Sequence, residues 1–162
     1  MVQTTFTLRR FQPSDLENVV RINQVCLPEN YSNYFFMDLY ERYPETFIVA
    51  EVYGEIAGYI MCRMETGLPD FGLLGITKRG HVISVAVLPQ CQRKGIGRAL
   101  MEEAMNRMKS YKAKECYLEV RVSNTPAIGL YNKLGFETQK TAHSYYADGE
   151  DAAIMTRKLA SS

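Results

Sequence analysis

The sequence predicts an α/β fold of the mixed α+β kind, in which a single sheet carries helices on its faces. The first observation is the order of the segments, strand, helix, helix, three strands, helix, strand, helix and two strands, which is not a strict alternation. The second is a change of apolar period from strand-like to helical between residues 82 and 108. The third is the length of 162 residues, which favours one domain spanning residues 1–162.

The amino-terminal part is expected to form one strand followed by two helices. Residues 4–11 alternate apolar and polar side chains, as a strand does. Ser14 and Glu17 have the spacing of a capping box, and the apolar residues after them repeat at helical intervals. Ser32 is then expected to cap a second, strongly aromatic helix that runs to Tyr43.

The next segments predict a hairpin and a loop. Residues 47–53 and 56–64 are strand-like and are joined at Gly54-Glu55, which predicts a hairpin. Residues 65–80 are polar, contain four glycines and one proline, and have little periodicity. They are therefore predicted to form a surface loop.

A strand, a turn and a helix are predicted between residues 82 and 108. Residues 82–88 are apolar at nearly every position, which predicts a strand buried on both faces. From residue 100 to residue 108 apolar side chains recur three and four apart, which predicts a helix with one apolar face. Between them lies Gln92-Arg93-Lys94-Gly95-Ile96-Gly97. Its glycines let the backbone come close to a ligand, and its N–H groups open a helix N-terminus, which attracts phosphate.

The carboxy-terminal part predicts a strand, a helix and two further strands. Residues 115–122 alternate, with the even-numbered apolar side chains on the buried side. A helix is expected to begin at Thr125-Pro126 and to end at Gly135. Residues 136–139 and 152–159 are strand-like, and an Asp-Gly pair between them is a hairpin signal.

Three kinds of phosphate-binding turn have comparable glycines and differ in spacing. A P-loop requires G-x-x-x-x-G-K-[ST], which is absent. A dinucleotide turn requires a small third residue, where this chain has Leu100, although Glu119 lies at about the right distance downstream. The pattern Gln/Arg-x-x-Gly-x-Gly/Ala fits at every position, and it resembles the acetyl-CoA pyrophosphate loop of the GNAT superfamily of N-acetyltransferases. An ordinary turn with solvated Arg93 and Lys94 is the remaining alternative.

Composition and charge argue against several other classes. Apolar residues make up 46% and charged residues 23%, as in an ordinary globular protein. The net charge of +1 gives no electrostatic reason to bind nucleic acid or an anionic membrane. No apolar run reaches about 18 residues, and no signal peptide is recognisable, so a cytoplasmic location is expected. The four cysteines are scattered without a C-x-x-C pair, which predicts reduced thiols and no metal site.

Other stretches extend the resemblance over nearly the whole chain. The pattern Asn-x-x-Ala-x-x-Leu-Tyr-x-x-x-Gly-Phe at 124–136 is similar to a second block of the superfamily. Narrower matches are Leu-Pro-Glu-Asn-Tyr at 27–31, Gly-His-Val-Ile-Ser at 80–84 and Tyr-Tyr-Ala-Asp-Gly-Glu-Asp at 145–151. Together they resemble the catalytic subunit of NatA-type N-terminal acetyltransferases and its archaeal relatives. The resemblance implies a GNAT domain, with a twisted, mostly antiparallel central sheet and about four helices, and acetyl-CoA as cosubstrate.

The resemblance also implies which residues act. Glu29 and His81 resemble the groups that accept the proton of the attacking amine, and Tyr131 resembles the tyrosine that donates to the CoA thiolate. The implied cofactor-binding residues are Val85, Ala86, Val87, Gln92, Arg93, Lys94, Gly95, Ile96, Gly97, Arg98, Asn124 and Tyr131. The implied peptide-binding residues are Leu27, Pro28, Glu29, Tyr31, Tyr145 and Tyr146. Without the resemblance, Glu29 would be taken as a solvated carboxylate and His81 as a polar strand end.

The predicted reaction moves acetyl from acetyl-CoA to the α-amino group of a protein or peptide in a ternary complex. No residue is placed as an acyl-accepting nucleophile, so direct transfer is favoured. Small first residues such as Ser and Ala, with broad tolerance, are the expected substrates. The expected partners are N-terminal segments, including nascent chains at the ribosome, and the chain is expected to be a monomer or small oligomer. The alternatives are a ribosomal-protein alanine N-acetyltransferase, a CoA-binding regulatory module without turnover, and a Rossmann-type domain.

Overall fold

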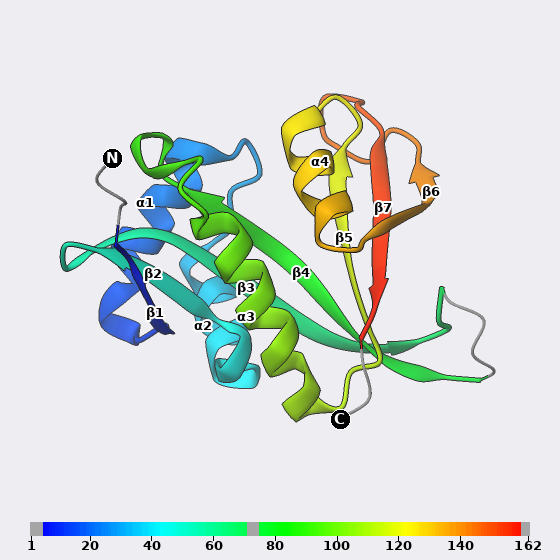
Figure 1. Ribbon diagram of the computed structural model, residues 1–162, viewed down its shortest axis with the longest axis horizontal. Coiled ribbons are helices and arrows are strands. Elements are labelled where there is room, and N and C mark those ends of the chain that lie inside the picture. The colour runs from blue at the N-terminus through cyan, green and yellow to red at the C-terminus, as the bar shows by residue number, and fades with distance from the viewer. Residues whose placement is uncertain (1–4, 71–74, 160–162) are drawn as a thin grey trace. The chain divides into compact units, whose positions relative to one another are not determined.

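The computed structural model describes residues 5–70 and 75–159 (Figure 1). The strands in these ranges are β1 (Thr7–Arg10), β2 (Ile48–Val52), β3 (Glu55–Gly67), β4 (Thr77–Val87), β5 (Glu115–Arg121), β6 (Glu137–Ala142) and β7 (Ala152–Lys158). The α-helices are α1 (Leu16–Cys26), α2 (Asn33–Arg42), α3 (Ile96–Met108) and α4 (Thr125–Lys133). Short 3-10 turns are Pro13–Asp15, Pro44–Thr46, Pro89–Cys91 and Lys109–Tyr111.

The strands form one sheet in the order β1-β2-β3-β4-β5-β7-β6. The pairs β1–β2, β2–β3, β5–β7 and β6–β7 are antiparallel. Strands β4 and β5 pair in parallel, with Arg79 opposite Glu115 and His81 opposite Tyr117. The predicted mixed α/β fold with a mostly antiparallel sheet is therefore confirmed.

The chain divides into two compact units. The first contains residues 1–63 and 82–108, and the second contains residues 64–81 and 109–162. Strands β3 and β4 each continue from one unit into the other along the chain. In the described residues, the first unit has an apolar core, whereas the second unit contains buried polar side chains around His81.

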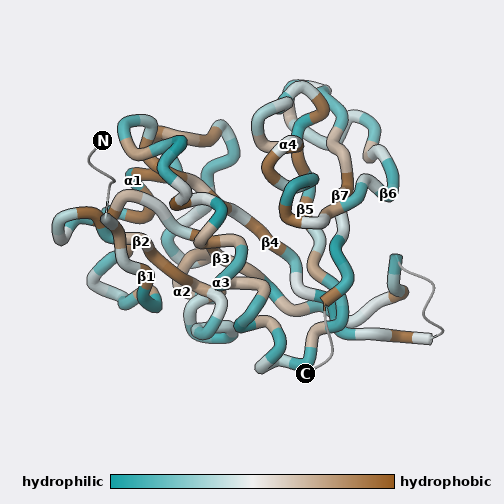
Figure 2. Tube along the Cα trace, viewed as in Figure 1, coloured by the Kyte–Doolittle hydropathy of each residue, from teal (hydrophilic) through white to brown (hydrophobic). Residues whose placement is uncertain are grey.

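Apolar side chains from strands and helices form the core of the first unit. Helix α1 contacts α2, and α3 contacts β2. Figure 2 shows apolar residues along β2 and along the middle of β4. Core side chains that are almost wholly buried include Phe11, Val19, Ile22, Phe36, Phe47, Tyr59 and Met61. Gly58 has no side chain because a Cβ there would lie 2.9 Å from the Ala86 carbonyl oxygen of the adjacent strand.

In the second unit, β5, β7 and β6 lie side by side with α4 (Figure 1). Helix α4 ends where Gly135 takes a φ of +88° and Phe136 N donates to the Tyr131 carbonyl, a common use of glycine after a helix. Cys116, Leu118 and Met155 are buried on the strands.

Several local predictions are confirmed because short-range chemistry determines them. Ser32 Oγ accepts a hydrogen bond from Phe35 N at 3.2 Å and caps α2. The apolar face predicted for residues 100–108 is buried, and α3 begins earlier, at Ile96.

The prediction of a loop over residues 65–80 is wrong at both ends. Strand β3 continues to Gly67 and β4 begins at Thr77, while residues 71–74 lie outside the described part of the chain. Main-chain pairing does not require apolar side chains, and the polar side chains Glu65 and His81 find partners of their own. The polar composition therefore concealed the ends of two strands.

Three smaller predictions also need correction. No capping box joins Ser14 and Glu17 in the described helix start: the Asp15 carboxylate accepts from Gln12 N at 2.8 Å and pairs with Arg9, so a 3-10 turn comes first. The strand at 82–88 is not buried on both faces, since the residues at 83, 85 and 87 are half-buried. Val122 lies beyond the end of β5 and is 46% exposed.

Candidate active site

The turn after β4 is closed by side-chain and backbone hydrogen bonds. Gln92 Nε2 donates to the Val87 carbonyl at 2.9 Å, and Cys91 N donates to the Leu88 carbonyl at 2.8 Å. Leu88 N donates to the Ala57 carbonyl of β3 at 2.8 Å. The predicted cofactor residues Val85, Ala86 and Val87 thus lead directly into a fixed turn.

Helix α3 presents its first amides at the end of this turn. Its first intrahelical bond runs from Ala99 N to the Gly95 carbonyl at 3.0 Å, so the amides of residues 96–98 are those a helix leaves without an intrahelical acceptor. Gly95 has a φ of +86°, and no other atom lies within 4 Å of the position a Cβ would take. Arg93 and Lys94 are exposed, and the first turn of α3 contains no acidic residue. This geometry suits a diphosphate.

A buried asparagine fixes the segment from Leu27 to Tyr31. Asn23 is fully buried; its Nδ2 donates to the Glu29 carbonyl at 3.0 Å, and its Oδ1 accepts from Tyr31 N at 3.4 Å. Tyr31 Oη donates to the Ile83 carbonyl of β4 at 3.4 Å. In the first unit the structure therefore brings the predicted peptide segment together with β4, the strand that precedes the turn at residues 88–98. Pro28 is exposed, and Leu27 and Glu29 are half-buried.

His81 is enclosed by acidic and aromatic side chains of the second unit. Its Nδ1 lies 2.8 Å from Glu65 Oε2, and its Nε2 lies 2.7 Å from Glu119 Oε2. The ring stacks on Tyr117 with a centroid distance of 4.2 Å and an interplanar angle of 15°. Tyr117 Oη donates to Glu65 Oε1. We call these four residues the His81 cluster.

The electrostatics of the His81 cluster favour a bound proton. Burial by itself lowers the pKa of His81, but the hydrogen bonds and charges of Glu119 and Glu65 outweigh it, so the pKa is raised. Burial and the bond to Glu65 raise the pKa of Tyr117, so this hydroxyl stays protonated at neutral pH.

Tyr131 and Asn124 lie on α4. Burial raises the pKa of Tyr131 to about 12, which keeps its hydroxyl protonated and able to donate. Its ring lies 5.9 Å from that of Phe136. Asn124 Oδ1 accepts from Ala127 N at 3.3 Å and caps α4, so Asn124 has a structural role whatever else it binds.

Arg121 holds the loop that carries Tyr145 and Tyr146. Its guanidinium lies 2.8 Å from Asp148 and 2.9 Å from Glu150, and it sits over the Tyr146 ring at 4.1 Å. The Glu150 backbone N–H, followed by Arg121, lowers the pKa of Asp148, and Ser123, followed by Arg121, lowers the pKa of Glu150. Tyr145 and Tyr146 meet edge to face with centroids 5.0 Å apart.

Sequence reasoning did not identify Glu65, Glu119 or Tyr117 as site residues. Glu65 fell in the predicted loop, and Glu119 was considered only as a ribose-binding residue of a dinucleotide fold. One signal was available: residues 117, 119 and 121 are polar or aromatic on the side of β5 opposite the apolar positions. A strand with such a face marks a place where polar side chains find partners. His143, which no motif surrounds, is 82% exposed as a side chain.

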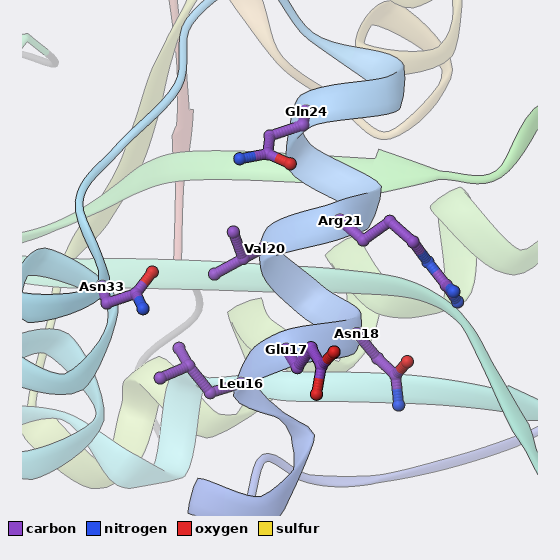
Figure 3. Close-up of a pocket in the computed structure, with 7 residues that line it drawn as sticks. All are labelled: Leu16, Glu17, Asn18, Val20, Arg21, Gln24 and Asn33. Carbon is purple, nitrogen blue, oxygen red and sulfur yellow. The ribbon is translucent and has the colours of Figure 1, made fainter.

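A separate pocket of 510 Å³ lies along α1. Figure 3 shows that its lining comes from α1 and from Asn33 at the start of α2. None of the predicted site residues lines it. Among residues 5–70 and 75–159 no group of His, Cys, Asp and Glu could hold a metal ion, and no helix in these ranges is long and apolar enough to cross a membrane.

The mixed sheet and the turn after β4, with the free amides of α3, agree with the fold and the anion-binding turn that the sequence predicts. Residues 16–136 match the acetyltransferase (GNAT) family, and the chain therefore belongs to that family.

Its relatives are N-α-acetyltransferases. The N-alpha-acetyltransferase of Sulfurisphaera tokodaii is 49% identical over 156 residues, which cover 95% of this chain and 93% of the relative. Ard1 from Thermoplasma volcanium is 31% identical with a TM-score of 0.82, covering 96% and 98% of the two chains. Naa20 from Chaetomium thermophilum, solved with a bisubstrate analogue, is 32% identical with a TM-score of 0.82, covering 94% and 86%. These comparisons confirm the predicted family and the predicted class of enzyme.

Proposed function

We propose that this chain transfers the acetyl group of acetyl-CoA to the α-amino group of proteins and peptides, directly and without an acyl-enzyme. The observation that carries the proposal is the turn at residues 88–98, which suits the diphosphate of CoA by its amides, its glycine and its cations. Relatives that act as N-α-acetyltransferases support the choice of acceptor.

The reaction makes a modest demand on a base. The amine nitrogen attacks the thioester carbonyl, the C–S bond breaks, the thiolate leaves, and the amine loses one proton. An α-amine has a pKa of about 7.7 to 8.0, whereas that of a lysine side chain is about 10.4. Glu29 and His81 are the proposed acceptors of that proton, directly or through water, and neither is fully essential. Tyr131 is the proposed donor to the leaving thiolate, supported by its raised pKa.

Residues from two segments are proposed to bind the peptide. Leu27, Pro28, Glu29 and Tyr31 belong to the segment fixed by Asn23, and Tyr145 and Tyr146 belong to the loop fixed by Arg121. Both segments are held by buried or charge-assisted hydrogen bonds. Because the segments are already ordered, less conformational entropy is lost when an extended peptide binds, and this favours selective binding. Small first residues, Ser and Ala, are the proposed preference, with broad tolerance.

We also propose that the substrates include nascent chains and that the enzyme acts in the cytoplasm. The four cysteines of the sequence are scattered without a C-x-x-C pair, which favours a reducing compartment.

Peptide acetylation tests the proposal directly. The purified protein is incubated with acetyl-CoA and peptides that differ only in their first two residues, each with a free or a formyl-blocked α-amine and with one internal lysine. We expect acetylation of free α-amines only, fastest for Ser and Ala. Acetyl on the lysine of blocked peptides would show a different acceptor, and CoA binding without any transfer would select the regulatory module.

A further inference from the structure

The two contacts of the His81 ring fix the number of protons that the ring shares with Glu65 and Glu119. Both ring nitrogens lie within 2.8 Å of carboxylate oxygens. A neutral imidazole has one N–H and one lone pair, so it can satisfy one of these contacts and would turn a lone pair toward the other carboxylate. Two short contacts of this kind need two protons shared among the imidazole and the two carboxyl groups. The arrangement that leaves both carboxylates ionised is the imidazolium.

The ring is also fixed in orientation and shielded from solvent. The His81 side chain is 9% exposed, Glu119 is 14% exposed and Glu65 is 27% exposed. Tyr117 stacks on the ring and donates to the second oxygen of Glu65. Glu65 therefore has one oxygen on the imidazole and the other on a phenol that stays protonated, and its carboxylate cannot turn away without losing both bonds.

Charged and titratable groups face the His81 ring from both neighbouring strands. Glu65 comes from β3, and Tyr117 and Glu119 come from β5. Arg79, on the same strand as His81, lies over the Tyr117 ring, with its guanidinium carbon 4.1 Å from the ring centroid. Its charge is matched by Asp70 at 2.6 Å and by the fully buried Glu115 at 3.1 Å. The groups that act directly on the His81 ring are thus the two carboxylates.

We propose that Glu65 is a positioning residue for the acetyl transfer: together with Glu119 it clamps the His81 ring and fixes the orientation of both ring nitrogens and their affinity for a proton. The inference rests on the proposed role of His81 in accepting the proton of the amine. Glu65 acts through His81 and has no contact with the substrate in this proposal.

The clamp brings the proton affinity of His81 closer to that of the α-amine that receives the acetyl group. An unperturbed histidine has a pKa of about 6.5, below the 7.7 to 8.0 of an α-amine. The two carboxylates raise the pKa of His81, and proton transfer is most effective when the proton affinities of donor and acceptor are close. When the clamped imidazolium loses its proton, the neutral ring becomes a base better matched to an α-amine.

The histidine content allows a direct test, because the chain has only His81 and His143. Imidazole resonances are titrated by NMR in the wild-type protein and in the variants Glu65→Gln, Tyr117→Phe and Asp151→Asn. Asp151 lies 3.2 Å from the exposed His143, so Asp151→Asn is the matched removal of a carboxylate from the other histidine. We expect Glu65→Gln to move the His81 midpoint to lower pH, and Asp151→Asn to leave the His81 midpoint where it is in the wild type.

The same variants are then compared in activity. In the wild type we expect kcat to rise with pH through the His81 midpoint. Glu65→Gln should shift this rise of kcat to lower pH by the amount seen in the NMR titration. It should lower the plateau by roughly twofold to fivefold, less than the loss of about tenfold expected when His81 itself is removed. Tyr117→Phe is expected to give a smaller shift in the same direction, and it tests the clamp if Glu65→Gln does not fold.

Two results would overturn the inference. If the His81 midpoint is the same in the wild type, Glu65→Gln and Tyr117→Phe, there is no clamp. If the His81 midpoint moves but the rise of kcat with pH does not move with it, Glu65 does not act on the reaction. A wild-type protein that acetylates no peptide would instead refute the proposed function and the catalytic half of the inference, and the NMR midpoints would still decide the clamp.

Discussion

The turn at residues 88–98 of the first unit, which we propose binds a diphosphate and call the phosphate turn, and the His81 cluster of the second unit are built in opposite ways. Residues 88–98 offer main-chain amides, an open glycine and three exposed cations, all within one short stretch of chain. The His81 cluster consists of side chains from three strands, with the central ring almost buried. Anion binding here needs a backbone conformation, whereas proton handling needs particular atoms at particular distances.

This difference predicts different sensitivities. A backbone site tolerates changes of side chain unless they add a charge or block the amides, and its failure weakens cofactor binding. A side-chain cluster responds even to the replacement of one carboxylate by an amide. Such a change is expected to alter kcat and the pH dependence of kcat. The kinetic constant that moves therefore identifies which kind of site was changed.

The largest effect is expected when both proposed bases are removed. Glu29→Gln and His81→Gln should each lower kcat about tenfold, and the double variant should lower it on the order of 10³-fold, within the range of general-base catalysis. The reason is that either group can accept the proton of an amine that is already partly neutral. Single and double variants are compared at saturating acetyl-CoA, with thermal melts to check folding. If one single variant loses as much as the double, that residue is the sole base.

A charge at the phosphate turn should have the next largest effect. Gly97→Glu places a carboxylate where the amides of α3 are proposed to meet a diphosphate, and KM for acetyl-CoA should rise about 100-fold with a much smaller change in saturated kcat. The control is Asn106→Glu, which adds the same charge at an exposed position of the same helix. Equal effects of the two variants would mean that net charge, and not the turn, governs binding.

The turn was predictable and the cluster was not, for a physical reason. The features of residues 92–97 that matter are glycines, cations and a following helix, and all are visible in one window of sequence. Ser32 as the cap of α2 and the apolar face of α3 belong to the same local category. The mostly antiparallel character of the sheet was predictable only through the resemblance to a known family, and the strand order is known from the structure alone.

The cluster depends on pairings that composition does not encode. Glu65 and Glu119 lie 16 and 38 positions from His81 along the chain. The prediction of a loop over 65–80 failed because polar residues in β3 and β4 satisfy one another across the strands. Register between β4 and β5, which sets His81 opposite Tyr117, is a tertiary property. Sequence reasoning could place His81 in a motif but could not find its partners.

A further contrast lies within the second unit, where Arg121 holds the 143–151 loop from outside the His81 cluster. Arg121→Gln removes the bonds to Asp148 and Glu150 and the contact with the Tyr146 ring. KM for the peptide should rise about threefold to tenfold, below the ~100-fold that a misplacement of 1 Å can cost, while KM for acetyl-CoA stays the same. Arg42→Gln is the matched control, since Arg42 also pairs with a carboxylate and lies over a tyrosine ring. A rise in both KM values would show that Arg121 supports the fold more widely than the loop.

The smallest effect concerns stability, and it depends on pH. Because the pKa of His81 is raised in the folded protein, its contribution to the free energy of unfolding is fully present below the unfolded value of about 6.5 and is lost as pH rises through the folded value. Glu65→Gln should therefore destabilise the protein by on the order of 1 kcal/mol near pH 6 and by less near pH 9. Urea unfolding of both proteins across this range measures the difference, with Asp38→Asn, which breaks the exposed pair with Arg42, as a variant whose effect should not vary with pH. A cost of Glu65→Gln that is the same at both ends of the range would mean that Glu65 stabilises the fold by its bond to Tyr117 alone and that His81 is not held as a cation.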